Sequence, residues 1–266
     1  MRARYASLAR ALETSTIQKG LYVESVDSSR TPRGDAYAVI DHPFVTVAGA
    51  FATPAILCES LILHINVQYC RATGGEESPA LSVALGKKTW QPLEDSYLIR
   101  LDFNTEASVD FMRVELSAKD GPLDTRDYLI AMELVAIDEQ HAFMHIQYAY
   151  TQGVLARVAT GVYFATNGRE KVGFTVIPNS ENAAPRLVGG IRGVLERNTM
   201  RYHLAFGAYL QALDAPPAQR FNTSLEYWFA DTERFARQLR EVTHDDYIAV
   251  KRRQYLRQTD VRQAAN

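Results

Sequence analysis

The sequence lacks most of the features by which membrane proteins, nucleic-acid-binding proteins and common enzyme classes are identified. Its longest apolar run, "AILCESLILHI" at 55–65, contains a glutamate and falls short of the roughly 20 residues that a membrane-spanning helix needs. A net charge of −2 gives no electrostatic case for nucleic-acid binding, which would favour a basic face. The chain has no HExxH, GxSxG, CxxC or complete P-loop motif. The corresponding metallopeptidase, hydrolase, thiol-redox and nucleotide-binding sites therefore have no support.

Histidine offers no metal site either. Six histidines are spread over the chain, and only His141 and His145 fall on one face of a predicted strand. Phe143 lies between them, and no carboxylates cluster nearby in the sequence. Zinc sites need three or four ligands in close spacing. We therefore predict no metal and no cofactor.

The chain has only two cysteines, Cys58 and Cys70. They could form one disulfide in an oxidising compartment or remain two buried thiols. A disulfide would favour a periplasmic protein whose export signal has been removed, and two thiols would favour the cytoplasm. The first segment, "MRARYASLARALETS", is an amphipathic helix rather than a signal peptide and starts abruptly. We therefore favour export.

The remaining pattern is that of a folded α+β protein, with 47% hydrophobic and 23% charged residues. A Ser/Pro/Gly loop at 26–37 leads into a short strand, "AYAVID". Pro43 suits the first turn of a helix, and Pro54 begins a second helix within 42–62. Period-two patterns then predict strands at 81–86, 96–103, 110–118, 127–138 and 140–150. A helix at 153–167, a strand at 171–177, a long helix at 188–213 and two polar helices follow.

The consecutive strands are joined by short turns, which indicates an antiparallel meander with one polar and one apolar face. Met144, Ile146 and Tyr148 alternate with His145 and Gln147 in the last strand of this series. The apolar face must be covered, and the helix at 188–213 is the obvious cover.

That long helix has polar residues on its apolar side. From Ile191, steps of three and four residues reach Asn198 and Tyr202. Arg192 and Glu196 point away and form a surface pair of small energetic value. An unpartnered buried amide costs on the order of 1–3 kcal/mol. Asn198 is therefore either a core residue bonded to the sheet or the lining of a cavity, and we favour the cavity.

The order of these elements resembles the helix-grip fold of the START and polyketide cyclase-like (SRPBCC) superfamily. The resemblance is carried by "DHPFVTVAGAFATPAILCESL", the strands from Leu81 to Tyr150 and "GGIRGVLERNTMRYHLAFGAYL". It implies a curved antiparallel sheet around a long C-terminal helix that encloses an apolar cavity. The expected divisions are an N-terminal helix and loop (1–34), a START-like domain (35–213) and a C-terminal helical extension (214–266). No catalytic motif accompanies this likeness.

The resemblance implies binding or transfer of a hydrophobic small molecule, with lipids among the candidates. Two alternatives are a polyketide cyclase or aromatase and a partner-binding module with a closed core. We expect a binding rather than a catalytic role, because no inward histidine or carboxylate offers a base. The expected ligand contacts are Tyr97, Phe103, Met112, Met144, Tyr148, Tyr150, Leu195, Asn198, Arg201, Tyr202 and Phe206.

The tail beyond residue 213 has mixed charges and reads as a solvated helical surface. Its basic segment "KRRQYLR" could make transient membrane contact, as a second and weaker interpretation. The expected partner is thus a hydrophobic ligand and no nucleic acid, and the sequence leaves the oligomeric state open.

Overall fold

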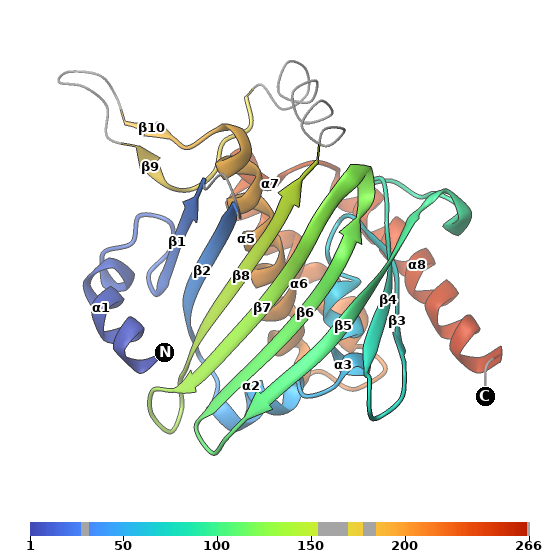
Figure 1. Ribbon diagram of the computed structural model, residues 1–266, viewed down its shortest axis with the longest axis horizontal. Helices are drawn as coiled ribbons and strands as arrows, with labels where there is room; N and C mark the ends of the chain where they lie inside the picture. Colours follow the sequence, from blue (N-terminus) through green and yellow to red (C-terminus); the bar gives the residue numbers. More distant parts are fainter. Residues whose placement is uncertain (28–31, 154–169, 178–184, 265–266) are drawn as a thin grey trace. The chain divides into compact units, whose positions relative to one another are not determined.

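The computed structural model describes residues 1–27, 32–153, 170–177 and 185–264 (Figure 1). Its eight main strands form one sheet in the order β1-β2-β8-β7-β6-β5-β4-β3, followed in the chain by the long helix α5 (Gly190–Gln211). The predicted α+β helix-grip class is thereby confirmed. The chain divides into two compact units. Unit 1 comprises Met1–Gly49 and Thr105–Met200, and unit 2 comprises Ala50–Asn104 and Arg201–Asn266.

The strands of unit 1 are antiparallel neighbours with a regular register. They are β1 (Leu21–Val26), β2 (Arg33–Ile40), β8 (Ala142–Gln152), β7 (Thr125–Ala136) and β6 (Phe111–Gly121). Met144 of β8 lies opposite Ala38 on one side and Leu134 on the other, and Leu134 lies opposite Met112. Because side chains alternate along a strand, this row and its neighbours two residues away form one apolar face.

The opposite face of this sheet is covered near one end by α1 (Arg2–Glu13). Leu8 and Leu12 of this helix form one buried cluster with Tyr37, Val135 and Phe143. The predicted N-terminal helix is confirmed, and its two leucines are its buried residues. The strand β1 was not predicted, because only half of its residues are buried and the polar ones mask the pattern.

The first turns of α5 pack very closely on β2. A Cβ atom added to Gly34 would lie 2.5 Å from the Thr199 hydroxyl oxygen and 3.0 Å from the Leu195 carbonyl oxygen. Leu195 and Thr199 are fully buried. Glycine at position 34 therefore sets how closely the helix approaches the strand.

We expect Gly34→Ala to lower the free energy of unfolding by about 2 kcal/mol, because the backbone of Leu195 cannot move away without displacing the helix. Gly49 is the matched control, since no atom lies within 4 Å of a Cβ added there. It is in α2 (Phe44–Ala50), so Gly49→Ala should be neutral or stabilise by up to about 1 kcal/mol. Urea unfolding of the two variants measures both effects, and equal stabilities would contradict the close packing at Gly34.

Unit 2 contains three strands, α3 and the C-terminal helices. Its elements are α3 (Pro54–Leu61), β3 (Val67–Thr73), β4 (Ala80–Leu85), most of β5 (Tyr97–Ala107), the second half of α5, α6 (Arg220–Arg234), α7 (Ala236–Leu239) and α8 (His244–Ala264). Pro54 begins α3 as predicted, and the Thr53 hydroxyl accepts a hydrogen bond from the Ile56 N–H. Among the described helices, none alone is long and apolar enough to span a membrane, and only the broken pair α2–α3 meets that test by length and composition.

Two elements predicted before α5 are not found as predicted in the described residues. The expected strand at 171–177 is reduced to β9 (Val176–Ile177), which pairs with β10 (Arg186–Leu187) in a separate two-stranded sheet. The expected helix at 153–167 falls on 154–169, outside the described residues.

The prediction that the tail charges form only a solvated surface is wrong for one side of α8. Lys251 is 1% exposed, and its Nζ donates to the carbonyl oxygens of His64 and Val67 at 2.8 Å each. Gln254 donates to Gln68, also in a buried contact. The aliphatic stem and polar end of Lys251 together hold α8 to the chain before β3.

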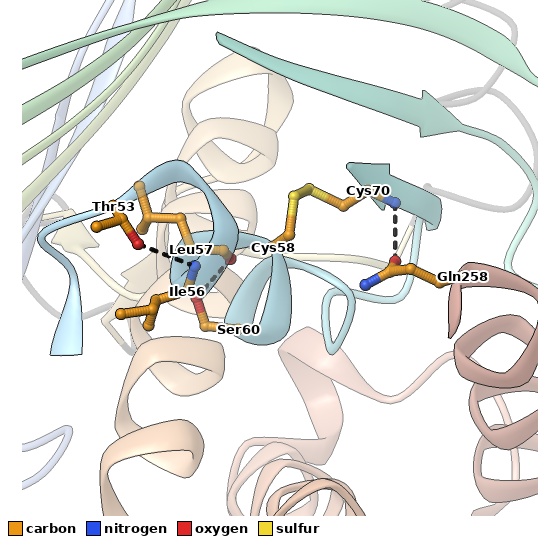
Figure 2. The surroundings of a disulfide bond; sticks show 7 residues. All are labelled: Thr53, Ile56, Leu57, Cys58, Ser60, Cys70 and Gln258. Atoms are coloured by element: carbon orange, nitrogen blue, oxygen red, sulfur yellow. Dashed lines mark hydrogen bonds between the residues drawn. A yellow bond between two sulfur atoms is a disulfide. The ribbon is translucent and has the colours of Figure 1, made fainter. Parts of the chain in front are cut away.

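The structure joins Cys58 of α3 to Cys70 of β3 in a disulfide (Figure 2). The Cα atoms are 5.2 Å apart, and both cysteines are fully buried. Beside it, the Gln258 side-chain oxygen accepts the Cys70 N–H at 3.0 Å. The covalent bond and α8 therefore fix the same stretch of β3.

Denatured, unreduced protein should show no thiol that reacts with an alkylating reagent. The bridge closes a loop of 12 residues. Removing it with Cys58→Ala/Cys70→Ala should cost about 3 kcal/mol of unfolding free energy in the chain-entropy model. Two reactive thiols per chain before reduction would contradict the pairing.

Candidate ligand-binding site

Four of the predicted ligand contacts lie on the apolar face of unit 1. Met112, Met144, Tyr148 and Tyr150 are between 0% and 7% exposed. Tyr148 lies opposite Gly34 on β2 and Ile130 on β7. Methionine adapts its shape to irregular surroundings, and tyrosine adds a polar end to a large apolar ring. This face can therefore accept apolar groups of varied shape.

Three tyrosines form a cluster at one end of this face. The Tyr128 ring stacks on Tyr150 at 5.4 Å, and Tyr148 lies 5.6 Å from Tyr150. Burial raises the pKa of the Tyr150 hydroxyl, and the neighbouring Tyr128 raises it further. Tyr150 is therefore a neutral hydrogen-bonding group rather than a base. Tyr128 was not predicted, because the β7 register shifts between Arg126 and Leu129.

Leu195 and Asn198 occupy the first half of α5 in different surroundings. Leu195 is fully buried against Gly34. Asn198 is only half-buried, although Arg197 and Thr199 on either side of it are buried. Asn198 therefore keeps accessible surface on a turn of the helix that is otherwise sealed.

The prediction that Arg192 and Glu196 form a surface pair is wrong. Glu196 is 0% exposed, and its carboxylate accepts hydrogen bonds from the Ser25 hydroxyl at 2.5 Å and from the Phe174 and Thr175 N–H groups at 2.5 and 2.9 Å. Arg192 donates to the same Ser25 oxygen at 3.0 Å. A carboxylate can be buried when several donors replace its water. The helical period of the sequence did not indicate that Glu196 is buried, because the donors to its carboxylate come from distant segments.

The other predicted contacts belong to unit 2 and have three different environments. Phe103 is buried on β5, whereas Tyr97 at the start of the same strand is 41% exposed. Phe206 is buried against Phe51, with ring centroids 5.1 Å apart. Arg201 is buried but pairs with Glu241 at 3.0 Å, so its guanidinium contacts the C-terminal segment. Among the predicted contacts in unit 2, Tyr97 is exposed and Arg201 is paired with an acidic side chain, so neither belongs to the buried apolar groups.

Tyr202 has a partner that sequence analysis missed. Its ring stacks on His64 at 4.6 Å with an interplanar angle of 23°. His64 is 4% exposed and lies between α3 and β3. Burial lowers the pKa of His64 well below its usual value, with further lowering by Arg201 and Lys251. The ring is therefore neutral.

A half-buried histidine lies on the other face of the unit 1 sheet. His145 Nε2 bonds to Asp35 and its Nδ1 bonds to Glu133, both at 2.9 Å. Burial alone would lower the pKa of His145, but the hydrogen bonds to the two carboxylates outweigh burial and raise it. Burial would raise the pKa of Asp35, and the bond to His145 outweighs burial and lowers it. This charged group links β2, β8 and β7.

The His145 group makes stability depend on pH. Its contribution is complete below about pH 6.5, the unfolded pKa of histidine, and is lost as the pH rises through the raised folded pKa. The contribution of Asp35 and Glu133 is complete above about pH 4.5 and is lost as the pH falls through their lowered folded values. We therefore expect His145→Gln to lower the unfolding free energy by about 3 kcal/mol near pH 5.5, and by less near pH 9.

Urea titrations of the wild type and this variant between pH 4 and pH 9 measure that difference. His141→Gln is the control, because the His141 side chain is 38% exposed, and it should change stability by less than about 0.5 kcal/mol. A loss that is constant from pH 5 to pH 9 would contradict a charged His145.

An open cleft of about 560 Å³ lies beside α1 in unit 1. Its lining includes Tyr5, Leu12, Val39 and His141. None of the predicted ligand contacts lines it, and Val39 alternates with Ala38 of the apolar face. Within the described ranges, no group of three or more His, Cys, Asp or Glu residues could hold a metal ion.

No family model matches the sequence, and no curated protein is similar to it. Solved structures with a similar chain path include human StAR-related lipid transfer protein 5, at 8% identity and a TM-score of 0.39, covering 62% of this chain and 91% of that one. Human STARD10 matches at 9% identity and a TM-score of 0.38, covering 64% of this chain and 76% of that one. The Zhui aromatase/cyclase from Streptomyces sp. R1128 matches at 6% identity and a TM-score of 0.35, covering 78% of this chain and 96% of that one. At these values the likeness transfers no ligand or activity, and the fold class rests on the sheet and α5 described above.

Proposed function

We propose that this protein binds and transfers a hydrophobic small molecule, most simply a lipid, in an internal apolar cavity. The observation that carries the proposal is the partial exposure of Asn198 beside buried Leu195 and Thr199. A polar side chain that stays accessible on an otherwise buried turn of a helix can orient the polar part of a ligand.

The apolar face of unit 1 supports the same proposal. Its methionines and tyrosines give the mixture of adaptable apolar surface and few polar groups that is typical of small-molecule sites. Burying about 200 Å² of hydrocarbon against such a face would contribute about 5 kcal/mol at 25 cal/mol per Å². No catalytic group is needed for this.

A cyclase would need a base, and the buried histidine of unit 2 does not supply one. The Asn66 N–H donates to His64 Nδ1 at 3.2 Å, so the proton of the neutral ring is on Nε2. Neither nitrogen then has a free lone pair to accept a proton from a substrate. This favours a binding protein over a polyketide cyclase.

We expect Asn198→Leu to abolish uptake of an environment-sensitive fatty-acid or polyaromatic probe while changing the melting temperature by only a few degrees. The leucine would remove a polar contact and add bulk where the ligand lies. Fluorescence titration and thermal unfolding of the same samples provide the two measurements.

Thr199→Val is the matched control. Thr199 is on the adjacent helical position, faces β2, and uses its hydroxyl to donate to the Leu195 carbonyl oxygen. Its replacement should leave probe binding intact. Unaltered probe binding in Asn198→Leu, or a stability loss of several kcal/mol from stranded partners, would refute the cavity at Asn198.

A further inference from the structure

The outward face of α8 in unit 2 carries an exposed leucine beside two arginines. The buried side of this helix includes Lys251 and Gln254. Arg252, Arg253 and Leu256 lie on the opposite side, and Leu256 is 61% exposed. Because α8 has 3.6 residues per turn, these three side chains are neighbours on one surface. Basic and apolar residues side by side on an exposed helix are typical of a helix that lies on a membrane.

Arg253 is held by an aromatic ring and not by an acid. Its guanidinium lies 3.8 Å from the centre of the Trp90 ring, and that of Arg257 lies 4.7 Å from the same centre. Arg257 also donates to the carbonyl oxygens of Gln68 and Gln91, at 2.6 and 3.3 Å, so it fastens α8 to β3 and to the loop after β4. In the described part of the chain, Arg253 has no hydrogen bond or ion pair. Its position is therefore fixed while its N–H donors remain available.

Two positive charges on one indole ring favour an anion beside them. Burial lowers the pKa of the Arg257 guanidinium and the charge of Arg253 lowers it further, while Glu94 acts in the opposite direction. Both arginines stay protonated at neutral pH, so they repel each other. An anion at Arg253 would reduce this repulsion. Guanidinium groups bind phosphate oxygens through two parallel N–H donors. The exposed side of Arg253 therefore suits a phosphate group.

Leu256 distinguishes a membrane phosphate from a soluble one. It follows Arg253 by three residues, so both side chains lie on the same side of α8. A soluble phosphate would leave Leu256 in water and gain nothing from it. A bilayer would bury this side chain below the level of the lipid phosphates, which is favourable for apolar surface. Tryptophan, here Trp90, is the residue type enriched at that level of a bilayer.

We propose that α8 docks on an anionic phospholipid membrane, with Arg253 at the lipid phosphates, Trp90 beside it and Leu256 among the acyl chains. The proposal goes beyond the proposed function, because it names a surface that the protein binds and does not depend on which ligand it carries. It also assigns the membrane interpretation of "KRRQYLR" to particular residues. Lys251 has no part in it, since this side chain is 1% exposed and donates to backbone carbonyl oxygens.

Co-sedimentation with two kinds of vesicle tests the docking, one of phosphatidylcholine alone and one of an equal mixture with phosphatidylglycerol. Wild-type protein should bind the mixed vesicles more tightly. Arg253→Gln should weaken that binding about fivefold, as expected for one basic side chain near an anionic surface. Leu256→Ala should weaken it about tenfold through lost apolar burial. Arg237→Gln is the matched control, because it removes an exposed arginine from α7 of the same unit and should keep the wild-type affinity.

Tryptophan fluorescence of the wild type gives a second measurement that needs no variant. The chain has two tryptophans, and Trp228 is 1% exposed. Mixed vesicles whose phosphatidylcholine carries brominated acyl chains should therefore quench the emission of Trp90 and leave that of Trp228 unchanged.

Three results would overturn the docking: equal binding of the wild type to both kinds of vesicle, equal losses in Arg253→Gln and Arg237→Gln, or unquenched emission. Binding of inorganic phosphate without binding of vesicles would also overturn it and assign the arginines to a soluble anion. None of these measurements uses the fatty-acid or polyaromatic probe. Their failure therefore leaves the proposed function standing, and loss of probe uptake leaves the docking standing.

Discussion

The buried carboxylate of Glu196 is the interaction on which the arrangement of unit 1 depends. It gathers a hydroxyl from β1 and two backbone N–H groups from the segment before β9, and all three donors must be in place for the charge to remain buried. This fixes the rotation of α5 and brings its next face onto β2. Gly34 is then required, because any larger side chain would meet the backbone of Leu195. The hydrogen bonds of Glu196 and the lack of a side chain at Gly34 together position α5.

Unit 2 uses polar side chains in a different way, to attach a helix to an irregular backbone. Lys251 and Gln258 of α8 bind backbone groups of the segment from His64 to Cys70, and the disulfide holds that segment to α3. Backbone groups at a strand start have no regular partners, so long polar side chains can satisfy them. The burial of Lys251 follows from this role, since its Nζ exchanges water for two carbonyl oxygens.

His145 and His64 show how the surroundings of a histidine determine its protonation state. His145 lies between two carboxylates and remains charged, so it joins strands and has no spare donor. His64 lies among cations and remains neutral, with one donor that no described residue uses.

The sequence by itself determined the α+β class, the helices opened by Pro43 and Pro54, the long helix and most of the sheet. These depend on local periodicity and on proline and turn chemistry, which a single chain displays directly. It also placed Met112, Met144 and Tyr148 on one apolar face, since strand alternation requires it. The burial of Glu196, the loss of Tyr97 to solvent and the position of His64 were decided by tertiary structure. The hydrogen-bond donors of Glu196 lie more than 20 residues away in the chain. No local pattern records which distant group replaces water around a polar atom.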